Sequence, residues 1–217
     1  QVPRQNIADM RTRGWELSVA WQDRLAVAGK LLNYSISAGV SDYTTKVTRY
    51  NNPSKLLSKY YVGQTLGELW GFSVGGFFVS DEEAANYPVD QSYLNQQIIT
   101  SVGERGLRAG DVKYLDLDGD NEISIGSNTV DNPGDQRIIG NTLPRYAYNF
   151  KLGASWNGVD FSAFFQGIGH QDWYPAGNAI SFWGPYSRPY CSFIPTQFMD
   201  EVWTETNTGA YFPRARG

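Results

Sequence analysis

Four stretches of this sequence place a large apolar or aromatic side chain at every second position. Successive side chains of a β-strand point to opposite faces of its sheet. Each stretch therefore predicts a strand with one apolar face and one face of small or polar residues. The predicted strands span residues 14–23, 31–42, 146–156 and 159–167.

Two classes of structure produce this alternation. A transmembrane β-barrel strand needs about 9–11 residues, turns alternate side chains to lipid, and carries aromatic residues near the membrane interfaces. Trp15 and Trp21 bracket the first stretch, and Tyr146 and Trp156 bracket the third, as aromatic girdles would require. A soluble antiparallel sheet with one face on a hydrophobic core alternates in the same way. Alternation alone therefore leaves both classes open.

The lengths of the connections favour the barrel. Short turns at residues 24–29 and at Asn157-Gly158 join the strands in pairs, whereas the other connections cover residues 44–144 and 168–217. Asn-Gly between alternating stretches is a strong signal for a hairpin turn. Outer-membrane barrels have tight turns on one rim and long loops on the other, and soluble sandwiches rarely contain so long a loop. We therefore predict an all-β fold of antiparallel transmembrane β-barrel strands with long extracellular loops.

The first long loop carries signals of its own structure. Ser80-Asp81-Glu82-Glu83 has the spacing of a capping box, which predicts a short helix that ends before Tyr87-Pro88. Trp70, Phe72 and Phe78 supply apolar side chains that a disordered segment would lack. A folded loop subdomain is expected.

Composition excludes several classes of function. The net charge of −4 comes without a basic cluster, so no nucleic-acid partner is expected. The single Cys191 excludes an internal disulfide and a zinc site built on cysteines. Without a run of about 18 apolar residues, no transmembrane helix is expected. No serine-hydrolase or zinc-protease motif is present. His170 is the only histidine of the sequence and is interpreted as a polar loop residue. An enzyme is therefore not expected.

The extent of the chain also enters the prediction. Gln1 is not followed by the basic and apolar regions of a signal peptide, so none is expected. Four strands are too few to close a barrel, since the smallest bacterial examples have about eight. We therefore expect an excerpt of a longer chain.

The most specific chemical motif is the segment Asp116-Leu117-Asp118-Gly119-Asp120-Asn121-Glu122-Ile123-Ser124. Carboxylates at relative positions 1, 3 and 5 with an apolar residue at position 8 match the first part of an EF-hand-type calcium loop. The expected Ca²⁺ ligands are Asp116, Asp118 and Asp120, with the carbonyl of Glu122 and the hydroxyl of Ser124 or a bridging water.

This loop departs from the calcium pattern at two positions. Asn121 stands where a glycine is usual, which is tolerable because asparagine visits the left-handed region. Ser127 stands at position 12 and has no carboxylate, so Asp131 or Asp135 would have to substitute. The alternative is a turn whose carboxylates accept backbone N–H bonds and bind no ion.

The last segment concentrates aromatic residues that could stack on sugar rings or grip peptide side chains. The candidates for ligand binding are Trp173, Tyr174, Trp183 and Tyr186. Packing of the loop against itself is the alternative for each of them. The sequence does not separate the two readings.

Several segments together resemble the SusC/RagA family of TonB-linked outer membrane proteins. They occur in the family's order and span nearly the whole chain. The matching segments are Arg13-Gly14-Trp15-Glu16-Leu17-Ser18, Tyr61-Val62-Gly63-Gln64, Gly67-Glu68-Leu69-Trp70-Gly71, 110–120, 137–146, Phe164-Phe165-Gln166-Gly167 and Asp172-Trp173-Tyr174.

The resemblance implies a place in the C-terminal half of an outer-membrane barrel of about 22 strands. It implies active import of glycan or peptide fragments into a Bacteroidota-like cell. A SusD-like surface lipoprotein would cap the barrel, and the TonB complex would act through parts of the protein that this chain lacks. The alternative from the residues alone is a secreted calcium-dependent glycan-binding β-domain, and a third hypothesis is an outer-membrane enzyme or adhesin with a folded loop domain.

Overall fold

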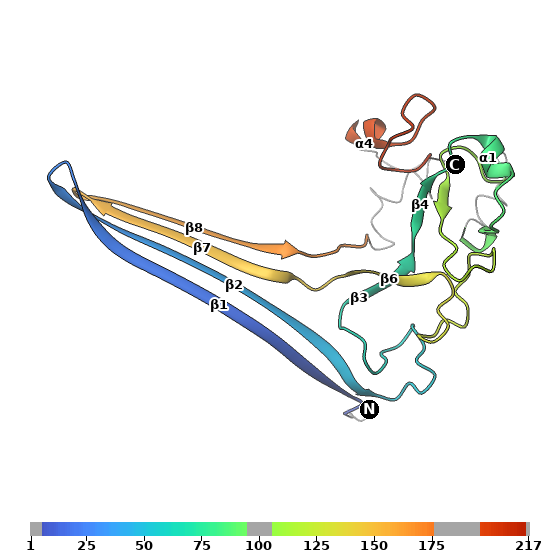
Figure 1. Cartoon of the computed structure of the whole chain (residues 1–217), viewed down its shortest axis with the longest axis horizontal. Helices are drawn as coiled ribbons and strands as arrows, with labels where there is room; N and C mark the ends of the chain where they lie inside the picture. Colours follow the sequence, from blue (N-terminus) through green and yellow to red (C-terminus); the bar gives the residue numbers. More distant parts are fainter. Residues whose placement is uncertain (1–5, 95–105, 176–195, 216–217) are drawn as a thin grey trace, which may run out of the picture. The chain divides into compact units, whose positions relative to one another are not determined.

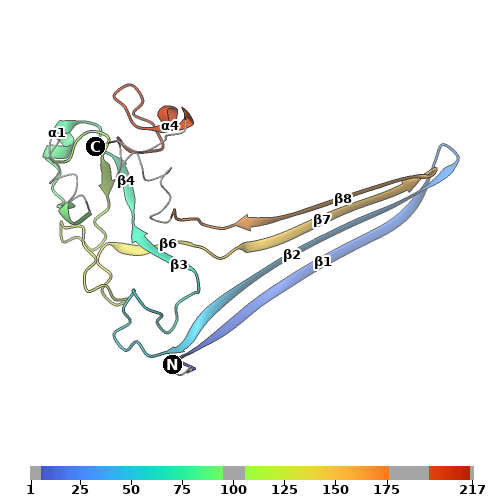
Figure 2. The ribbon, with the colours of Figure 1, turned by 180° about the vertical axis from the view of Figure 1, so that it is seen from behind.

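Four long antiparallel strands form the main sheet of this protein, in the order β1-β2-β7-β8 (Figure 1). The computed structural model describes residues 6–94, 106–175 and 196–215. The strands are β1 (Ala8–Val27), β2 (Lys30–Tyr50), β7 (Arg145–Trp156) and β8 (Val159–His170). Figure 2 shows the same strand order from the reverse side. The fold of the described residues is therefore mostly antiparallel β-sheet, as expected.

Two-residue turns close both hairpins of this sheet. Val27 pairs with Lys30 and Trp156 pairs with Val159, so only Ala28-Gly29 and Asn157-Gly158 lie outside the strands. All four turn residues have positive φ, between 48° and 82°, which matches the twist of the flanking strands in a type I′ turn. The first turn is shorter than residues 24–29 because the ladder continues to Val27.

The first two strands are longer than their apolar stretches. Residues 8–13 of β1 pair with residues 44–50 of β2, beyond the expected bounds of 14–23 and 31–42. The pairing there rests on backbone hydrogen bonds and polar contacts, such as the 2.8 Å bond between the hydroxyls of Thr12 and Thr45. Hydrophobic alternation marks only the apolar part of a strand. The predicted strands were therefore shorter than the strands in the structure.

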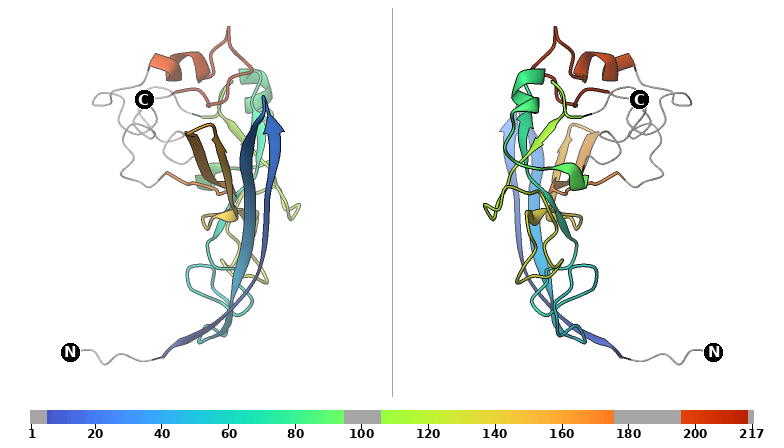
Figure 3. Two further views of the ribbon diagram at one scale, coloured as in Figure 1. Left: turned by 90° about the vertical axis from the view of Figure 1, so that its left-hand side faces the viewer. Right: turned by 90° about the vertical axis from the view of Figure 1, so that its right-hand side faces the viewer.

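The chain divides into two compact units, and the main sheet belongs to the first, which comprises residues 1–55, 59–69 and 140–173. Figure 3 looks toward the ends of the strands and shows β1, β2, β7 and β8 as a single curved layer. In the described residues of this unit, no helix packs on the sheet.

The second unit comprises residues 56–58, 70–139 and 174–217. Its core contains Phe78 and Ile123, both fully buried, and the nearly buried Trp203. The expected folded loop subdomain is therefore present. The remaining elements are β3 (Glu68–Phe72) paired with β6 (Gln136–Asn141), β4 (Val74–Phe77) paired with β5 (Val112–Tyr114), α1 (Asp81–Ala85) and α4 (Thr196–Glu201). Among the described residues, no helix combines the length and apolar character that a membrane crossing requires.

Helix α1 begins as the capping box predicts. The Ser80 hydroxyl accepts a 3.1 Å hydrogen bond from the Glu83 N–H, and the Glu83 carboxylate reaches back to the Val79 N–H at 2.7 Å. The Lys113 ammonium lies 2.6 Å from the same carboxylate, and these bonds hold the pKa of Glu83 below its usual value. Asn86 caps the other end, just before Tyr87-Pro88.

Candidate functional site

One face of the main sheet is apolar across all four strands. The strand register aligns the alternating side chains into rows, so the face is continuous. Three of these rows are Val19, Ala38, Phe150 and Phe165; Trp21, Ile36, Leu152 and Ala163; and Leu25, Leu32, Trp156 and Val159. Charged residues also occupy positions of this face, among them Asp23, in the row of Tyr34, Ala154 and Phe161; Asp42, the register partner of Trp15; and Lys30, the partner of Val27.

The large side chains of this face are exposed. Trp21 is 61% exposed, Val19 59% and Phe165 57%, so no core covers them within the described residues. A soluble sheet of the alternative class would bury these side chains against a second layer. Soluble proteins rarely expose a contiguous apolar face of this extent, which marks it as a surface for lipid or a partner.

The opposite face of the sheet carries mostly small and polar residues, with the exposed Phe164 and Ile168 of β8 as large apolar exceptions. The small residues there let neighbouring side chains lie across the strands: a Cβ on Gly39 would meet the Asn149 amide at 2.9 Å, and one on Gly153 would meet the Ser35 hydroxyl at 2.5 Å. Two such rows are Ser18, Gly39, Asn149 and Gln166, and Gln22, Ser35, Gly153 and Ser162. The sheet thus has one predominantly apolar face and one predominantly polar face.

An ion pair fixes the end of the β2–β7 pairing. The Arg145 guanidinium donates to both carboxylate oxygens of Asp42, at 2.6 and 2.5 Å. Asp42 is buried, and a two-point guanidinium–carboxylate contact is among the strongest polar contacts in proteins. Tyr146, next in the chain, has φ of +56° and interrupts the regular pairing with β8. This end is where the long connections leave the sheet.

The acidic loop of the second unit gathers three carboxylates. One oxygen each of Asp116, Asp118 and Asp120 lies within 4.8 Å of the others. Oxygens bound to one Ca²⁺ at about 2.3–2.6 Å can be separated by up to about 5 Å, so this spacing fits the ion. Asn121 has φ of +63°, the left-handed conformation that position 6 of a calcium loop requires.

The same carboxylates also accept backbone hydrogen bonds within the loop. Asp116 accepts from the N–H groups of Gly119, at 2.6 Å, and Asn121, at 2.9 Å. Burial and the neighbouring negative charges of Asp120, Asp135 and Asp116 raise the pKa of Asp118 above its ordinary value. The loop therefore has turn-type bonds and an unfavourable concentration of negative charge, which a cation would relieve.

Buried neighbours hold the loop in place. Both oxygens of Asp135, which is fully buried, accept backbone bonds, from Leu117 at 2.7 Å and from Ser124 at 2.8 Å. The fully buried Ile123 donates its N–H to the Asp90 carbonyl at 2.7 Å. Asp135 thus ties the two ends of the acidic segment together.

The two other expected ligands lie at the end of the same loop. The N–H of Glu122 donates to Asp120 at 2.8 Å, and the Ser124 hydroxyl accepts from Gly126 at 3.1 Å. Neither contact brings an oxygen of these residues to the three carboxylates, so their role as ligands stays a prediction.

The aromatic candidates are only partly described. Trp173 is 73% exposed and Tyr174 is 59% exposed, as side chains that meet a ligand would be. Trp183 and Tyr186 lie outside the described residues. His170 ends β8, and its Nε2 lies 3.1 Å from Asp172, whose carboxylate also accepts from the Asn141 N–H at 2.7 Å. The bond from Asn141 and the contact with His170 hold the pKa of Asp172 below its usual value.

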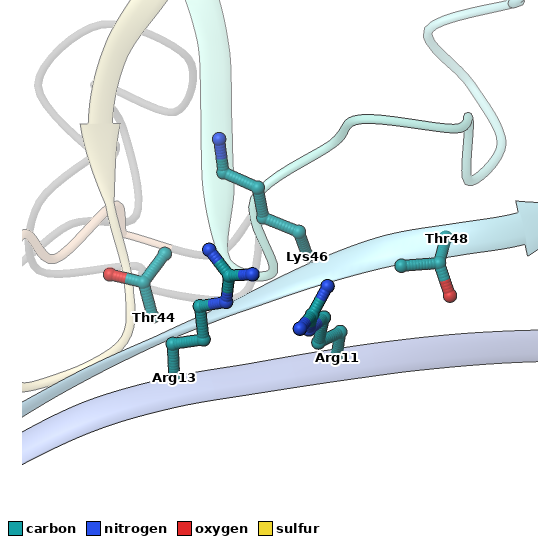
Figure 4. A pocket seen from close by; sticks show the side chains of 5 residues that line it. All are labelled: Arg11, Arg13, Thr44, Lys46 and Thr48. Carbon is teal, nitrogen blue, oxygen red and sulfur yellow. The ribbon is translucent and has the colours of Figure 1, made fainter.

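A basic cluster at the end of β1 and β2 is a feature that the sequence reasoning missed. Arg11, Arg13 and Lys46, with Thr44 and Thr48, line a cavity of about 280 Å³ (Figure 4). The expectation that the chain lacks a basic cluster is therefore wrong for this surface. The only sequence signal is that Arg11 and Arg13 share the odd positions of Trp15, because Lys46 joins them through the strand register.

Comparison with known proteins places these features in context. No family model matches the chain. The chain is 25% identical, over 185 residues, to "TonB-dependent receptor P39" of Formosa agariphila, in an alignment that covers 75% of this chain. The chain spans 17% of the length of that relative. In sequence, this chain is thus similar to one section of a TonB-dependent receptor.

Proposed function

We propose that this chain is a section of the barrel of a TonB-dependent transporter in the outer membrane. The observation that carries the proposal is the four-strand sheet with an exposed apolar face, a polar face opposite, and short turns at one end. The apolar face would contact lipid and the polar face would line the lumen. The similarity to a TonB-dependent receptor supports the same reading. Further strands of a longer protein would close the barrel.

The finer proposal is a SusC/RagA-type transporter for glycan or peptide fragments. The segments that resemble this family support it, together with the exposed rings of Trp173 and Tyr174. These rings, with Trp183 and Tyr186, would contact the ligand at the extracellular mouth, beneath a SusD-like lipoprotein. Import would be a conformational process driven by the TonB complex. No residue of this chain is assigned a covalent step.

Cell fractionation of the full-length protein tests the barrel. We expect the protein in the outer-membrane fraction, with a faster-migrating band on gels when the sample is not heated, because folded barrels resist detergent. A gene deletion should abolish growth on the imported glycan or peptide, and the wild-type gene should restore it. Recovery of a soluble, heat-insensitive protein from the culture medium would contradict the transporter. It would favour the alternative, a secreted calcium-dependent glycan-binding domain, which the acidic loop supports.

We also propose that the acidic loop binds Ca²⁺ through Asp116, Asp118 and Asp120. Ca²⁺ would neutralise the crowded carboxylates and hold the loop in its curled conformation. Glu122 and Ser124 would complete the ligand set through a carbonyl and a hydroxyl or a bridging water. The ion would stabilise the second unit and would take no part in chemistry.

Calorimetric titration of the full-length protein with CaCl₂ tests this site. Replacing Asp118 and Asp120 together by asparagine is expected to weaken calcium uptake at least about tenfold, because two charged ligands are lost. Asp200→Asn with Glu205→Gln is the matched control, since it removes the same charge from exposed positions of the same unit. Equal uptake by both double variants and the wild type would refute the calcium site.

A further inference from the structure

The basic cluster lies on the apolar face of the sheet, directly beyond its aromatic edge. Arg11 and Arg13 precede Trp15 in β1 and lie on the same side of the strand, and the pairing with β2 has no irregularity between these positions. Lys46 is the register partner of Arg11, and Thr44 is the partner of Arg13. The three cationic side chains therefore come from adjacent positions of two paired strands, and Figure 4 shows them with Thr44 and Thr48 on either side.

Within the part of the chain that the structure describes, the positive charge of the cluster has no carboxylate in contact with it: none lies within 4.0 Å of Arg11, Arg13 or Lys46. The two carboxylates that flank the cluster on these strands are already paired: Asp42 with Arg145, and Asp9 with Arg49. Like charges directly opposite each other in a sheet destabilise the strand pair. An anion shared by the three side chains would remove this repulsion.

The height of the cluster identifies the anion. A strand rises about 3.3 Å per residue and tilts by roughly 40° in a barrel, so Arg13 would lie roughly 5 Å and Arg11 roughly 10 Å above Trp15. The headgroup layer on each side of the hydrocarbon is roughly 5–7 Å thick. With Trp15 at the edge of the hydrocarbon, Arg13 would lie within this layer, and Arg11 and Lys46 would lie roughly 3–5 Å beyond it, a distance that their long side chains can span to reach the lipid phosphates.

We propose that Arg11, Arg13 and Lys46 form a binding site for the phosphate of an anionic lipid headgroup at the rim where the long loops leave the sheet. The two threonine hydroxyls would add neutral hydrogen bonds to the phosphate. The proposal rests on the proposed function, since it takes the apolar face to contact lipid. The site would fix one lipid against the outer surface of the barrel and would be separate from the transport path.

Native mass spectrometry of the full-length protein, released from detergent micelles with dioleoyl phosphatidic acid, tests the site. Wild-type protein is expected to bind at least one phosphatidic acid molecule more tightly than dioleoyl phosphatidylcholine. The triple variant R11Q/R13Q/K46Q should weaken this binding by on the order of a hundredfold, since each interfacial cation contributes roughly fivefold. The charge-preserving variant R11K/R13K/K46R should retain most of the binding.

A matched control separates a local site from net charge. K59Q/R137Q/K151Q removes three positive charges from exposed positions outside the cluster and should bind phosphatidic acid like the wild type. Equal lipid binding by the two glutamine triple variants would overturn the site, and displacement of the lipid by millimolar inorganic phosphate would overturn the assignment to a headgroup. Heat-modifiable migration of each variant verifies folding. A variant that folds in the outer membrane but keeps its lipid refutes this inference alone, whereas a protein absent from the outer membrane refutes the proposed function.

Discussion

Replacing Ala38 by arginine in the full-length protein is expected to lower the free energy of unfolding in a bilayer by about 2–4 kcal/mol. Ala38 pairs with Val19 and Phe150 in a row of the apolar face. In a barrel this row lies close to the middle of the hydrocarbon, because apolar rows continue on both sides of it. A guanidinium there would have to leave water or deform the bilayer to reach it.

The sheet supplies a control with the same chemical change. Ala20 is exposed on the opposite face and pairs with Ser37. In the proposed barrel, Ala20→Arg would place its charge in the water-filled lumen. We expect this variant to change stability by no more than about 0.5 kcal/mol, as for most surface substitutions. Urea titration of the proteins folded in phosphatidylcholine vesicles, followed by heat-modifiable migration, measures both. Equal effects of the two substitutions would mean that the apolar face does not meet lipid.

The faces of the main sheet were predictable because they depend on a period-two pattern and on local turn chemistry. Asn157-Gly158 specifies its hairpin through the positive φ of both residues, and the apolar alternation specifies which side chains share a face. The ends of β1 and β2 could not be predicted from this pattern. Arg11, Arg13 and Lys46 continue the ladder with no apolar alternation, so the cluster emerges only when the register of β1 and β2 is known.

The acidic loop divides in the same way between local and tertiary determinants. The gathering of Asp116, Asp118 and Asp120 and the left-handed Asn121 follow from spacing within one short segment. The roles of the more distant Asp131 and Asp135 do not follow from spacing, because a spacing pattern cannot predict that residue 135 contacts residues 117 and 124. The sequence left Asp131 and Asp135 as equal candidates for a ligand, whereas the structure uses both oxygens of Asp135 to accept backbone bonds.

Substitution of Asp135 by asparagine is therefore expected to weaken the second unit by about 2–4 kcal/mol. The buried carboxylate accepts from the N–H groups of Leu117 and Ser124 at 2.7 and 2.8 Å. An asparagine can accept only one of these bonds through its carbonyl, and its amide would point N–H groups at the other donor. One buried donor would lose its partner, and the two ends of the acidic segment would separate more easily.

Limited trypsin digestion of the folded full-length protein measures this local opening. Cleavage after Arg137, two residues beyond Asp135, should accelerate by roughly 30- to 1,000-fold when opening precedes cleavage, which corresponds to the expected loss of free energy. Asp131→Asn is the control, since Asp131 is exposed and its substitution removes the same charge four residues away. If Asp131→Asn accelerates cleavage as much as Asp135→Asn does, loss of negative charge and not loss of the two backbone bonds governs the stability of this loop. Unchanged cleavage in the Asp135 variant would show instead that the loop stays closed without this carboxylate.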